Sequence, residues 1–258
     1  VDTFISLSVP DATARSNGLR TGSLDMTPVD PRIANMLDKS PNVTVHSTPS
    51  GAQFEWVMMC DRKPTNDLNL RLAMKHCPDR QAMVDSLLQG HGVIGNDFSV
   101  NPGIPTYCKS IPQHDFDPDK ARYYWKKTGL SGIEVSVSNQ AGDFAVDATV
   151  MLKEGAKKAG IDVTVKRVAE DGYWDNTWMK VPMCASNWNS RPTADLMLTL
   201  VYQSQAKWNE TQWKNDRFDE LLVMGRKTTD PDTRKQIYCE AETLLHDDGG
   251  SIVPMYMN

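Results

Sequence analysis

The chain has 258 residues, of which 40% are hydrophobic and 24% are charged, and its formal net charge is -5. This balance is typical of a globular protein and excludes a disordered or fibrous chain. No block of lysine and arginine interleaves with aromatic residues, which argues against a nucleic-acid partner. No apolar run approaches the ~20 residues that a membrane span needs.

The first fifty residues predict two strands and two short helices. Residues 3–9 and 42–49 alternate apolar and polar side chains, as half-buried strands do. A helix is expected near residues 11–22, with Gly22 just past its end, and a second one begins at Asp30-Pro31. The segment has no basic stretch followed by an apolar run, so an export signal, if the protein has one, is expected outside these residues.

The next part of the chain predicts a buried strand, two helices and a long loop. Residues 54–60 are densely apolar, which favours a strand covered on both faces. Helices are expected over 65–77 and 79–90, because Pro78 interrupts the first and Gly90 ends the second. Residues 91–116 are rich in Gly, Pro and Asn, and loops of this length often carry function. Within that loop, Asn96 and Asp97 either cap a turn or face a cleft.

From residue 117 onward, helices and strands alternate. This alternation predicts an α/β architecture with a mixed, mainly parallel sheet flanked by helices. Pro254 in the last strand implies an edge position or a local break. The expected helices are 118–127, 144–159, 172–179, 193–202, 216–227 and 230–246, and the expected strands are 133–138, 161–168, 182–188 and 251–257.

Sequence signatures of catalysis and metal binding are sparse. The five histidines are scattered without a metal-binding pair, and neither a nucleophile-elbow motif nor a phosphate-binding loop of the GxxxxGK[ST] type is present. We therefore expect no metal and no cofactor. The five cysteines form no CxxC pair, so buried free thiols are expected, with one disulfide left open.

The segment 184–209 carries the most informative combination of residues. Trp188, Asn189 and Arg191 follow a predicted strand, and α/β sheets bind ligands beyond the carboxyl ends of strands. An indole stacks on planar or apolar groups, and a guanidinium holds a carboxylate through two parallel hydrogen bonds. The alternative is that Trp188 belongs to the core and Arg191 pairs with Asp195 or another acid.

Four further tryptophans are assigned to packing. Trp174 and Trp178 have helical spacing, which is typical of a core-facing pair. Trp208 and Trp213 flank a short polar stretch and are expected to pack a surface loop.

Five segments, in their order along the chain, carry a resemblance to a known family. They are DATARSNGLRTGSLDM (11–26), DLNLRLAMKHCPDRQAMVDSLLQGHGVIGNDF (67–98), DFDPDKARYYWKKTGL (115–130), AKKAGIDVTVKRV (156–168) and TTDPDTRKQIYCEAETLLHDDGGSIVPMY (228–256). In this order they resemble the motifs of the oligopeptide- and dipeptide-binding proteins, the extracytoplasmic receptors of ABC importers that form extracellular solute-binding protein family 5. The resemblance runs almost from end to end.

This resemblance implies a fold and a function. The fold is a periplasmic-binding-protein-like lobe of type II, with residues 1–55 as a remnant of the first lobe and residues 56–258 as the second, ligand-binding lobe. The function is that of a monomeric periplasmic receptor that binds a peptide or a similar small polar or anionic solute without altering it and delivers it to the permease of an ABC importer. The chain resembles only the C-terminal half of such receptors.

The ligand segment departs from the family pattern. Dipeptide receptors resemble W-x-x-D here, with the aspartate receiving the amino terminus of the peptide, whereas this chain has WNSRPTAD with Arg191 near that position. The departure suggests an anionic group on the solute. The ligand contacts expected are Trp188, Asn189 and Arg191, followed by Asn96 and Asp97.

Two other functions stay open at this point. One is a hydrolase that uses Cys184 as its nucleophile, which would need a histidine or a carboxylate brought to the thiol by folding. The other is a structural fragment that binds no solute.

Overall fold

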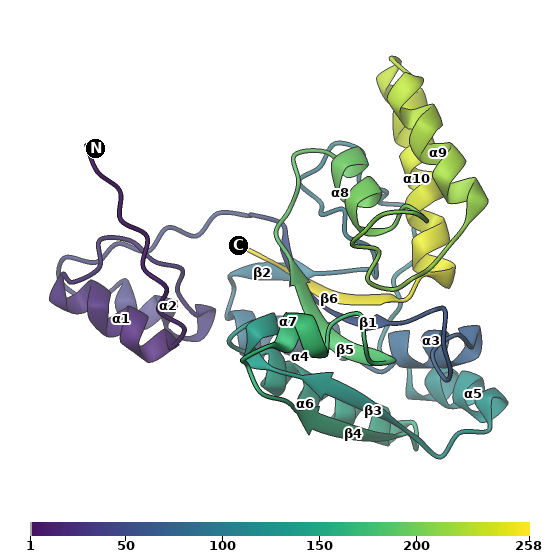
Figure 1. Cartoon of the computed structure of the whole chain (residues 1–258), viewed down its shortest axis with the longest axis horizontal. Coiled ribbons are helices and arrows are strands. Elements are labelled where there is room, and N and C mark those ends of the chain that lie inside the picture. The colour runs from purple at the N-terminus through teal and green to yellow at the C-terminus, as the bar shows by residue number, and fades with distance from the viewer. Residues whose placement is uncertain (1) are drawn as a thin grey trace.

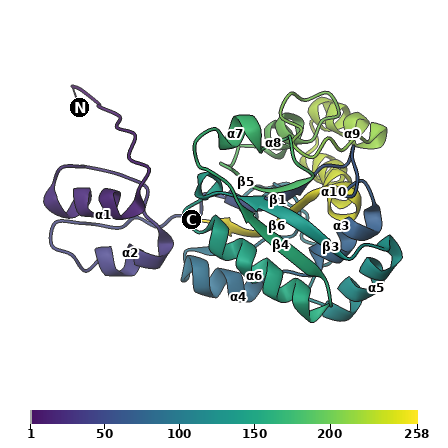
Figure 2. The same cartoon turned by 60° about the horizontal axis from the view of Figure 1, so that its bottom comes forward.

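The computed structural model describes residues 2–258, and one sheet of six strands in the order β2-β6-β1-β5-β3-β4 forms its centre. Helices cover both faces of this sheet (Figures 1 and 2), so the predicted α/β architecture is confirmed. The strands are β1 (Ala52–Met58), β2 (Gly92–Ile94), β3 (Gly132–Val137), β4 (Asp162–Arg167), β5 (Met183–Trp188) and β6 (Ser251–Met257).

The sheet is mixed, as predicted, but the expectation that it is mainly parallel is wrong. Three pairings (β1–β5, β1–β6 and β2–β6) are antiparallel and two (β3–β4 and β3–β5) are parallel. A parallel pair needs a long crossover connection. Only the consecutive strands β3, β4 and β5 are joined by such crossovers, through α6 and α7, whereas β1 and β6 run against their neighbours.

The helices form two layers. Figure 2 shows α4, α5 and α6 on one face of the sheet and α8, α9 and α10 on the other. The helices beside the sheet are α3 (Leu68–Lys75), α4 (Arg80–Met83) with the wider turn η1 (Val84–Leu88), α5 (Pro118–Thr128), the short turn η2 (Asn139–Ala141), α6 (Ala145–Lys158), α7 (Tyr173–Asn176), α8 (Ala194–Val201), α9 (Asp216–Lys227) and α10 (Pro231–Asp248).

Aspartate caps and prolines set the starts of several helices, as the sequence predicts. Asp117 and Asp230 each accept a backbone N–H of the first helical turn, and a proline follows directly. Proline has no N–H to leave unpaired there, and its φ angle suits a helix. At the other end of α5, Gly129 adopts a φ of 67°, a left-handed conformation that glycine reaches without steric cost.

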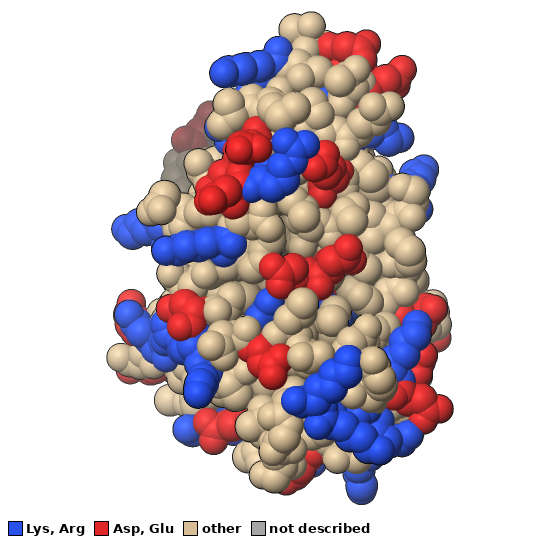
Figure 3. Space-filling model, turned by 90° about the vertical axis from the view of Figure 1, so that its right-hand side faces the viewer, with Lys and Arg blue, Asp and Glu red and all other residues tan. Residues whose placement is uncertain are grey.

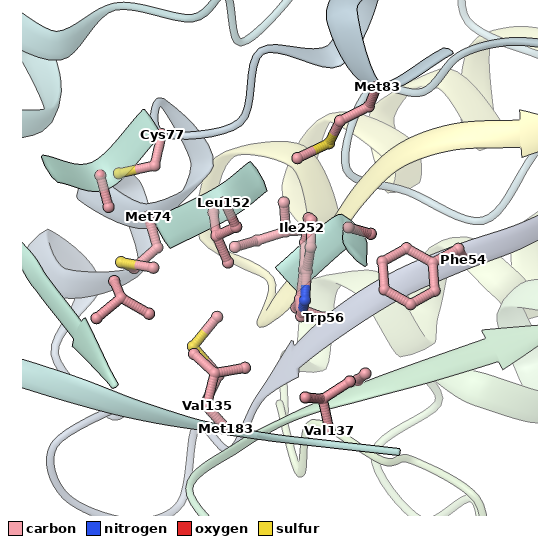
Figure 4. Close-up of a cluster of buried hydrophobic side chains, with 14 of the residues drawn as sticks. Phe54, Trp56, Met74, Cys77, Met83, Val135, Val137, Leu152, Met183 and Ile252 are labelled. Carbon is pink, nitrogen blue, oxygen red and sulfur yellow. The ribbon is translucent and has the colours of Figure 1, made fainter. Parts of the chain in front are cut away.

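The main hydrophobic core lies between the sheet and the layer of α3, α4, α5 and α6. Strand β1 sends Phe54, Trp56 and Met58 into it, each with 0% exposure, and the indole N–H of Trp56 donates to Thr149 of α6 at 2.9 Å. Figure 4 shows this cluster around Trp56. Strand β1 is covered on both faces, as predicted from its dense apolar run.

A different interior lies on the opposite face of the sheet. A second apolar cluster joins α8, α9 and α10 to the loop around Phe98. Between that cluster and the sheet lies a set of buried polar side chains, which we call the polar layer. Its members are Gln53, Glu55, Ser99, Ser186, Tyr202, Glu210 and Ser251.

Residues 2–51 lie outside the sheet and contain α1 (Ala12–Thr21) and α2 (Pro31–Leu37). Figure 1 shows both helices beside the main body. The strands expected over 3–9 and 42–49 are wrong, because neither segment is a strand and no described strand lies beside them to complete their hydrogen bonds. The apolar side chain of Phe4, for example, is 77% exposed.

The division expected at residues 55 and 56 falls inside β1, which is an inner strand of the sheet. In the structure, the chain enters the sheet at Ala52. Ion pairs of Arg15 with Asp143 and of Arg32 with Asp147 connect the two helices before this point to the rest of the molecule.

The structure decides two alternatives that the sequence leaves open. Strand β6 is internal, and its register against β1 shifts at Pro254, so this proline marks a local break and not an edge. Cys108 of the long loop and Cys239 of α10 form a disulfide, while Cys60, Cys77 and Cys184 are free thiols.

Charged side chains of both signs are interspersed on the face shown in Figure 3. Ion pairs of exposed side chains include Arg122–Asp119 on α5 and Arg217–Glu240 between α9 and α10. In the part of the chain that the structure describes, no helix has the length and apolar character that crossing a membrane requires.

Candidate ligand-binding site

A surface depression with a volume of ≈ 390 Å³ lies at the end of β5, where the chain leads into α8. Trp188 is the last residue of β5, and Asn189 and Arg191 follow it in the turn. The structure therefore brings these three sequence-predicted residues together at the carboxyl end of a strand. The depression is lined by Trp174, Trp178, Ser186, Asn187, Trp188, Asn189, Arg191 and Trp208.

Arg191 is free of acidic partners. Its Nη1 donates to the carbonyl oxygen of Asn189 at 2.7 Å, and its guanidinium carbon lies 5.8 Å from the ring centroid of Trp188. Asp195 instead pairs with Arg226 at 2.9 Å, so the alternative that Arg191 pairs with Asp195 is wrong. Nothing among residues 2–258 forms an ion pair with this guanidinium, which lies beside an indole face.

Four tryptophans form what we call the tryptophan wall of the depression: Trp174, Trp178, Trp188 and Trp208. The rings of Trp188 and Trp208 have centroids 6.0 Å apart, and those of Trp174 and Trp178 are 5.7 Å apart. Trp174 and Trp208 are 37% and 42% exposed. The expectation that Trp174 and Trp178 face the core is wrong for Trp174, because helical spacing does not reveal which way a short helix faces. Trp208 lies in the loop between α8 and α9, where it packs against Trp188.

A buried carboxylate lies behind this wall. Glu210 has 0% exposure and accepts the indole N–H groups of Trp178 and Trp188, each at 2.5 Å, and the hydroxyl of Ser186 at 2.7 Å. Sequence reasoning missed this residue, because a single glutamate in a polar loop carries no signal of burial. The only hint in the sequence is its place directly after Trp208 and Asn209.

A second buried carboxyl group, that of Glu55, belongs to the same polar layer and also has 0% exposure. Burial raises the pKa of Glu55 well above its usual range, and the neighbouring Glu210 raises it further. Burial also raises the pKa of Glu210, but donors from Trp178, Ser186 and Trp188 oppose this rise. Burial thus raises the pKa of both carboxyl groups, and the three donors counteract this rise only at Glu210.

The structure does not bring Asn96 and Asp97 to the depression. Both are buried, and Asp97 accepts hydrogen bonds from Arg80 at 2.8 and 2.9 Å and contacts the ring nitrogen of His114 at 2.8 Å. The side-chain oxygen of Asn96 accepts the backbone N–H of His114 at 3.2 Å. These contacts hold the long loop against α4 and β6.

The thiol of Cys184 is unsuited to nucleophilic chemistry. It is buried in β5, and burial raises its pKa to about 12, so the reactive thiolate is scarce at neutral pH. The described residues also contain no group of three His, Cys, Asp or Glu side chains placed to hold a metal ion.

A larger depression of ≈ 610 Å³ lies elsewhere, between the helices α1 and α2 and residues 43–47. Its lining is mostly short apolar and polar side chains, such as Leu19, Met26 and Val45. It has neither an arginine nor a tryptophan. The depression at the end of β5, in contrast, combines aromatic faces with an arginine that forms no ion pair with the described residues.

The chain is similar to known bacterial solute-binding proteins. Residues 1–210 match the family model described as bacterial extracellular solute-binding proteins, family 5 Middle. The chain is 26% identical to a di/tripeptide-binding protein of Pseudomonas aeruginosa, an alignment that covers 95% of this chain and 48% of that protein. It is 25% identical to a glutathione-binding protein of Escherichia coli, covering 95% of this chain and 50% of the other.

Solved structures give the same fold. A periplasmic binding protein of Helicobacter pylori in complex with the peptide STSA superposes with a TM-score of 0.84 at 23% identity, over 97% of this chain and 51% of that one. A Campylobacter jejuni protein in complex with Ni(L-His) gives a TM-score of 0.85 at 19% identity, over 96% and 54% of the two chains. The chain thus spans about half the length of the proteins it matches.

Proposed function

Because the chain belongs to the bacterial extracellular solute-binding proteins of family 5, we propose that it captures a peptide or a similar small polar or anionic solute and delivers it to an ABC importer. The observation that carries the proposal is the depression at the end of β5, where an unpaired guanidinium and the tryptophan wall face the same space. The receptor works in the periplasm as a monomer. It binds its solute and catalyses no reaction.

Each side chain in the turn after β5 has a distinct role in this proposal. The indole of Trp188 stacks on a planar or apolar part of the solute. Arg191 holds a carboxylate of the solute, for which its charge and its remaining N–H donors are suited. Asn189 is exposed beside it and offers an amide for a further hydrogen bond.

The mechanism is closure of two lobes around the solute. The sheet with its two helical layers forms one lobe, and the residues before β1 belong to the other. Contacts that bridge the lobes exist only in the closed form, so the solute shifts the population toward that form. This requires the remainder of the receptor, since the chain spans about half the length of its relatives.

The experiment compares Arg191→Ala with the wild type in the full-length protein. Native mass spectrometry first identifies the solute that co-purifies, and titration calorimetry then measures its affinity. We expect Arg191→Ala to weaken binding by about 2 kcal/mol, or roughly 30-fold. Arg217→Ala, which removes an exposed arginine paired with Glu240 on the far helices, is the matched control and should leave the affinity unchanged. Equal affinities of the Arg191→Ala variant and the wild type would show that Arg191 does not contribute to solute binding.

A further inference from the structure

Two carboxyl groups are buried together behind the tryptophan wall without a cation. Glu55 and Glu210 both have 0% exposure, and no lysine, arginine or histidine among residues 2–258 forms an ion pair with either. A buried carboxylate is costly unless something compensates its charge. The compensation here comes from the hydrogen-bond donors of the site itself.

The strand register explains why these groups meet. In the antiparallel pair of β1 and β5, Glu55 lies opposite Ser186 and Gln53 lies opposite Trp188. Side chains directly opposite one another share a face of the sheet. All four therefore lie on the face of the sheet that bears the polar layer, where Glu210 from the loop between α8 and α9 accepts hydrogen bonds from Ser186 and Trp188.

The arrangement of donors is specific. Glu210 receives the N–H of Trp188 on Oε1 and the N–H of Trp178 together with the hydroxyl of Ser186 on Oε2. Glu55 accepts a donor from Gln53 on Oε1 at 2.9 Å, while its Oε2 makes no hydrogen bond with the heavy atoms around it. Three donors converge on Glu210 and one on Glu55, so an ionised Glu210 and a protonated Glu55 fit this distribution, because an ionised carboxylate only accepts hydrogen bonds.

We propose that Glu210 is the positioning residue of the tryptophan wall, that its carboxylate fixes the indoles of Trp178 and Trp188 by accepting an N–H from each, and that Glu55 carries the proton of the buried pair. The N–H groups of both indoles are therefore already hydrogen-bonded behind the wall, and each ring presents its carbon face to the depression. The solute then meets a rigid apolar surface, with polar contacts left to Asn189 and Arg191.

This inference rests on the proposed function in one respect, namely that the tryptophan wall contacts the solute. The positions of the two indoles are a property of the chain without solute. Other titratable groups that face the pair are Cys184 of β5, Tyr173 of α7 and Tyr202 after α8, and none of them is a cation at neutral pH.

Nuclear magnetic resonance of the indole N–H groups tests the proposal. The protein has seven tryptophans, and Trp→Phe variants assign the signals of Trp178, Trp188 and Trp208 in a protein labelled with ¹⁵N. In the unsubstituted protein, the N–H groups of Trp178 and Trp188 should exchange with water at least roughly tenfold more slowly than that of Trp208, which is 42% exposed. Equal exchange rates would overturn the proposal without any variant of Glu210.

Isosteric variants of the two carboxyl groups then separate their roles. Glu210→Gln keeps the shape but offers one acceptor oxygen, so one of the two indoles must lose its partner and exchange faster. Glu55→Gln mimics a protonated Glu55 and should leave both signals in place. The assignment of Glu210 is overturned if Glu210→Gln changes neither signal, and the assignment of the proton is overturned if Glu55→Gln moves both.

Binding measurements link the wall to function. With the dipeptide Ala-Ala and with glutathione as probes, the full-length Glu210→Gln variant should bind at least roughly tenfold more weakly than the wild type, while Glu55→Gln should match it. If the wild type binds both probes and Glu210→Gln binds them equally well, the wall is not positioned by Glu210 for solute contact. If the wild type binds neither probe, the solute class proposed above is wrong, and the exchange data still decide the role of Glu210.

Discussion

Substituting Asp97 by asparagine tests the buried charge network that holds the long loop. Asp97 is 1% exposed and accepts two hydrogen bonds from Nη2 of Arg80 and one from the backbone N–H of Val253, and it contacts a ring nitrogen of His114. Its φ of 63° lies in the left-handed region, which asparagine tolerates better than most residues. Asp97→Asn therefore removes the charge while leaving the backbone unstrained.

The expected loss of stability in Asp97→Asn follows from the burial of Arg80. Arg80 is 4% exposed, so after Asp97→Asn its charge stays buried without a carboxylate. Removing one member of a buried pair costs about 3 to 5 kcal/mol. The asparagine oxygen keeps one hydrogen bond, which places the expected loss of unfolding free energy near the lower value, at about 3 kcal/mol.

Urea unfolding followed by circular dichroism measures this loss, with an unchanged dependence on urea as the sign that only stability changed. Asp119→Asn is the matched control, because Asp119 pairs with Arg122 on the surface of α5 with a side chain that is 90% exposed. That variant should change stability by about 0.5 kcal/mol or less. A loss below about 1 kcal/mol for Asp97→Asn would refute the view that this pair is effectively desolvated.

Two further predictions concern pH and packing. Burial lowers the pKa of His114 to about 4, whereas the ordinary value is about 6.5. Between these two pH values the unfolded chain binds a proton at His114 and the folded protein does not. Stability should therefore decline as the pH falls from 6.5 to 4, by up to about 3 kcal/mol from this group. His114→Asn should flatten the decline in urea midpoints across that range, and an unchanged slope would show that another group causes it. Gly155→Ala on α6 would place a Cβ 2.1 Å from the carbonyl oxygen of Cys77, so it should destabilise the protein by about 1 to 2 kcal/mol despite the better helix propensity of alanine. Glu154→Ala, on the exposed side of the same helix, should have little effect in thermal unfolding, and equal melting temperatures of the two variants would contradict the close approach of α6 to Cys77.

The sequence predicts those elements that carry their own local signals. The helices that begin at Asp117-Pro118 and Asp230-Pro231 lie where expected, because a capping carboxylate and a proline act within one turn of the chain. The inner strand β1 was identifiable from its dense apolar run. The strand expected at 42–49 failed because alternation describes one face of a strand and says nothing of a neighbour with which to pair.

The candidate site was only half accessible from the sequence. Trp188, Asn189 and Arg191 could be placed together because they lie within four residues of one another at the end of a predicted strand. Trp208 and Glu210 belong to the loop between α8 and α9, which folds back to the depression at the end of β5. No local sequence pattern predicts the course of this loop. Long-range packing decides such positions, so the tryptophan wall and its buried carboxylate required the structure.

The place of β6 in the sheet has a consequence for synthesis on the ribosome. This strand comes last among the elements and yet lies between β2 and β1, joining the edge strand to the centre. Until residues 251–257 have left the exit tunnel, one side of β1 lacks its partner and β2 has nothing to pair with. A nascent chain that stops before this point would therefore expose an open apolar strand, and it is during this interval that a chaperone would be needed most.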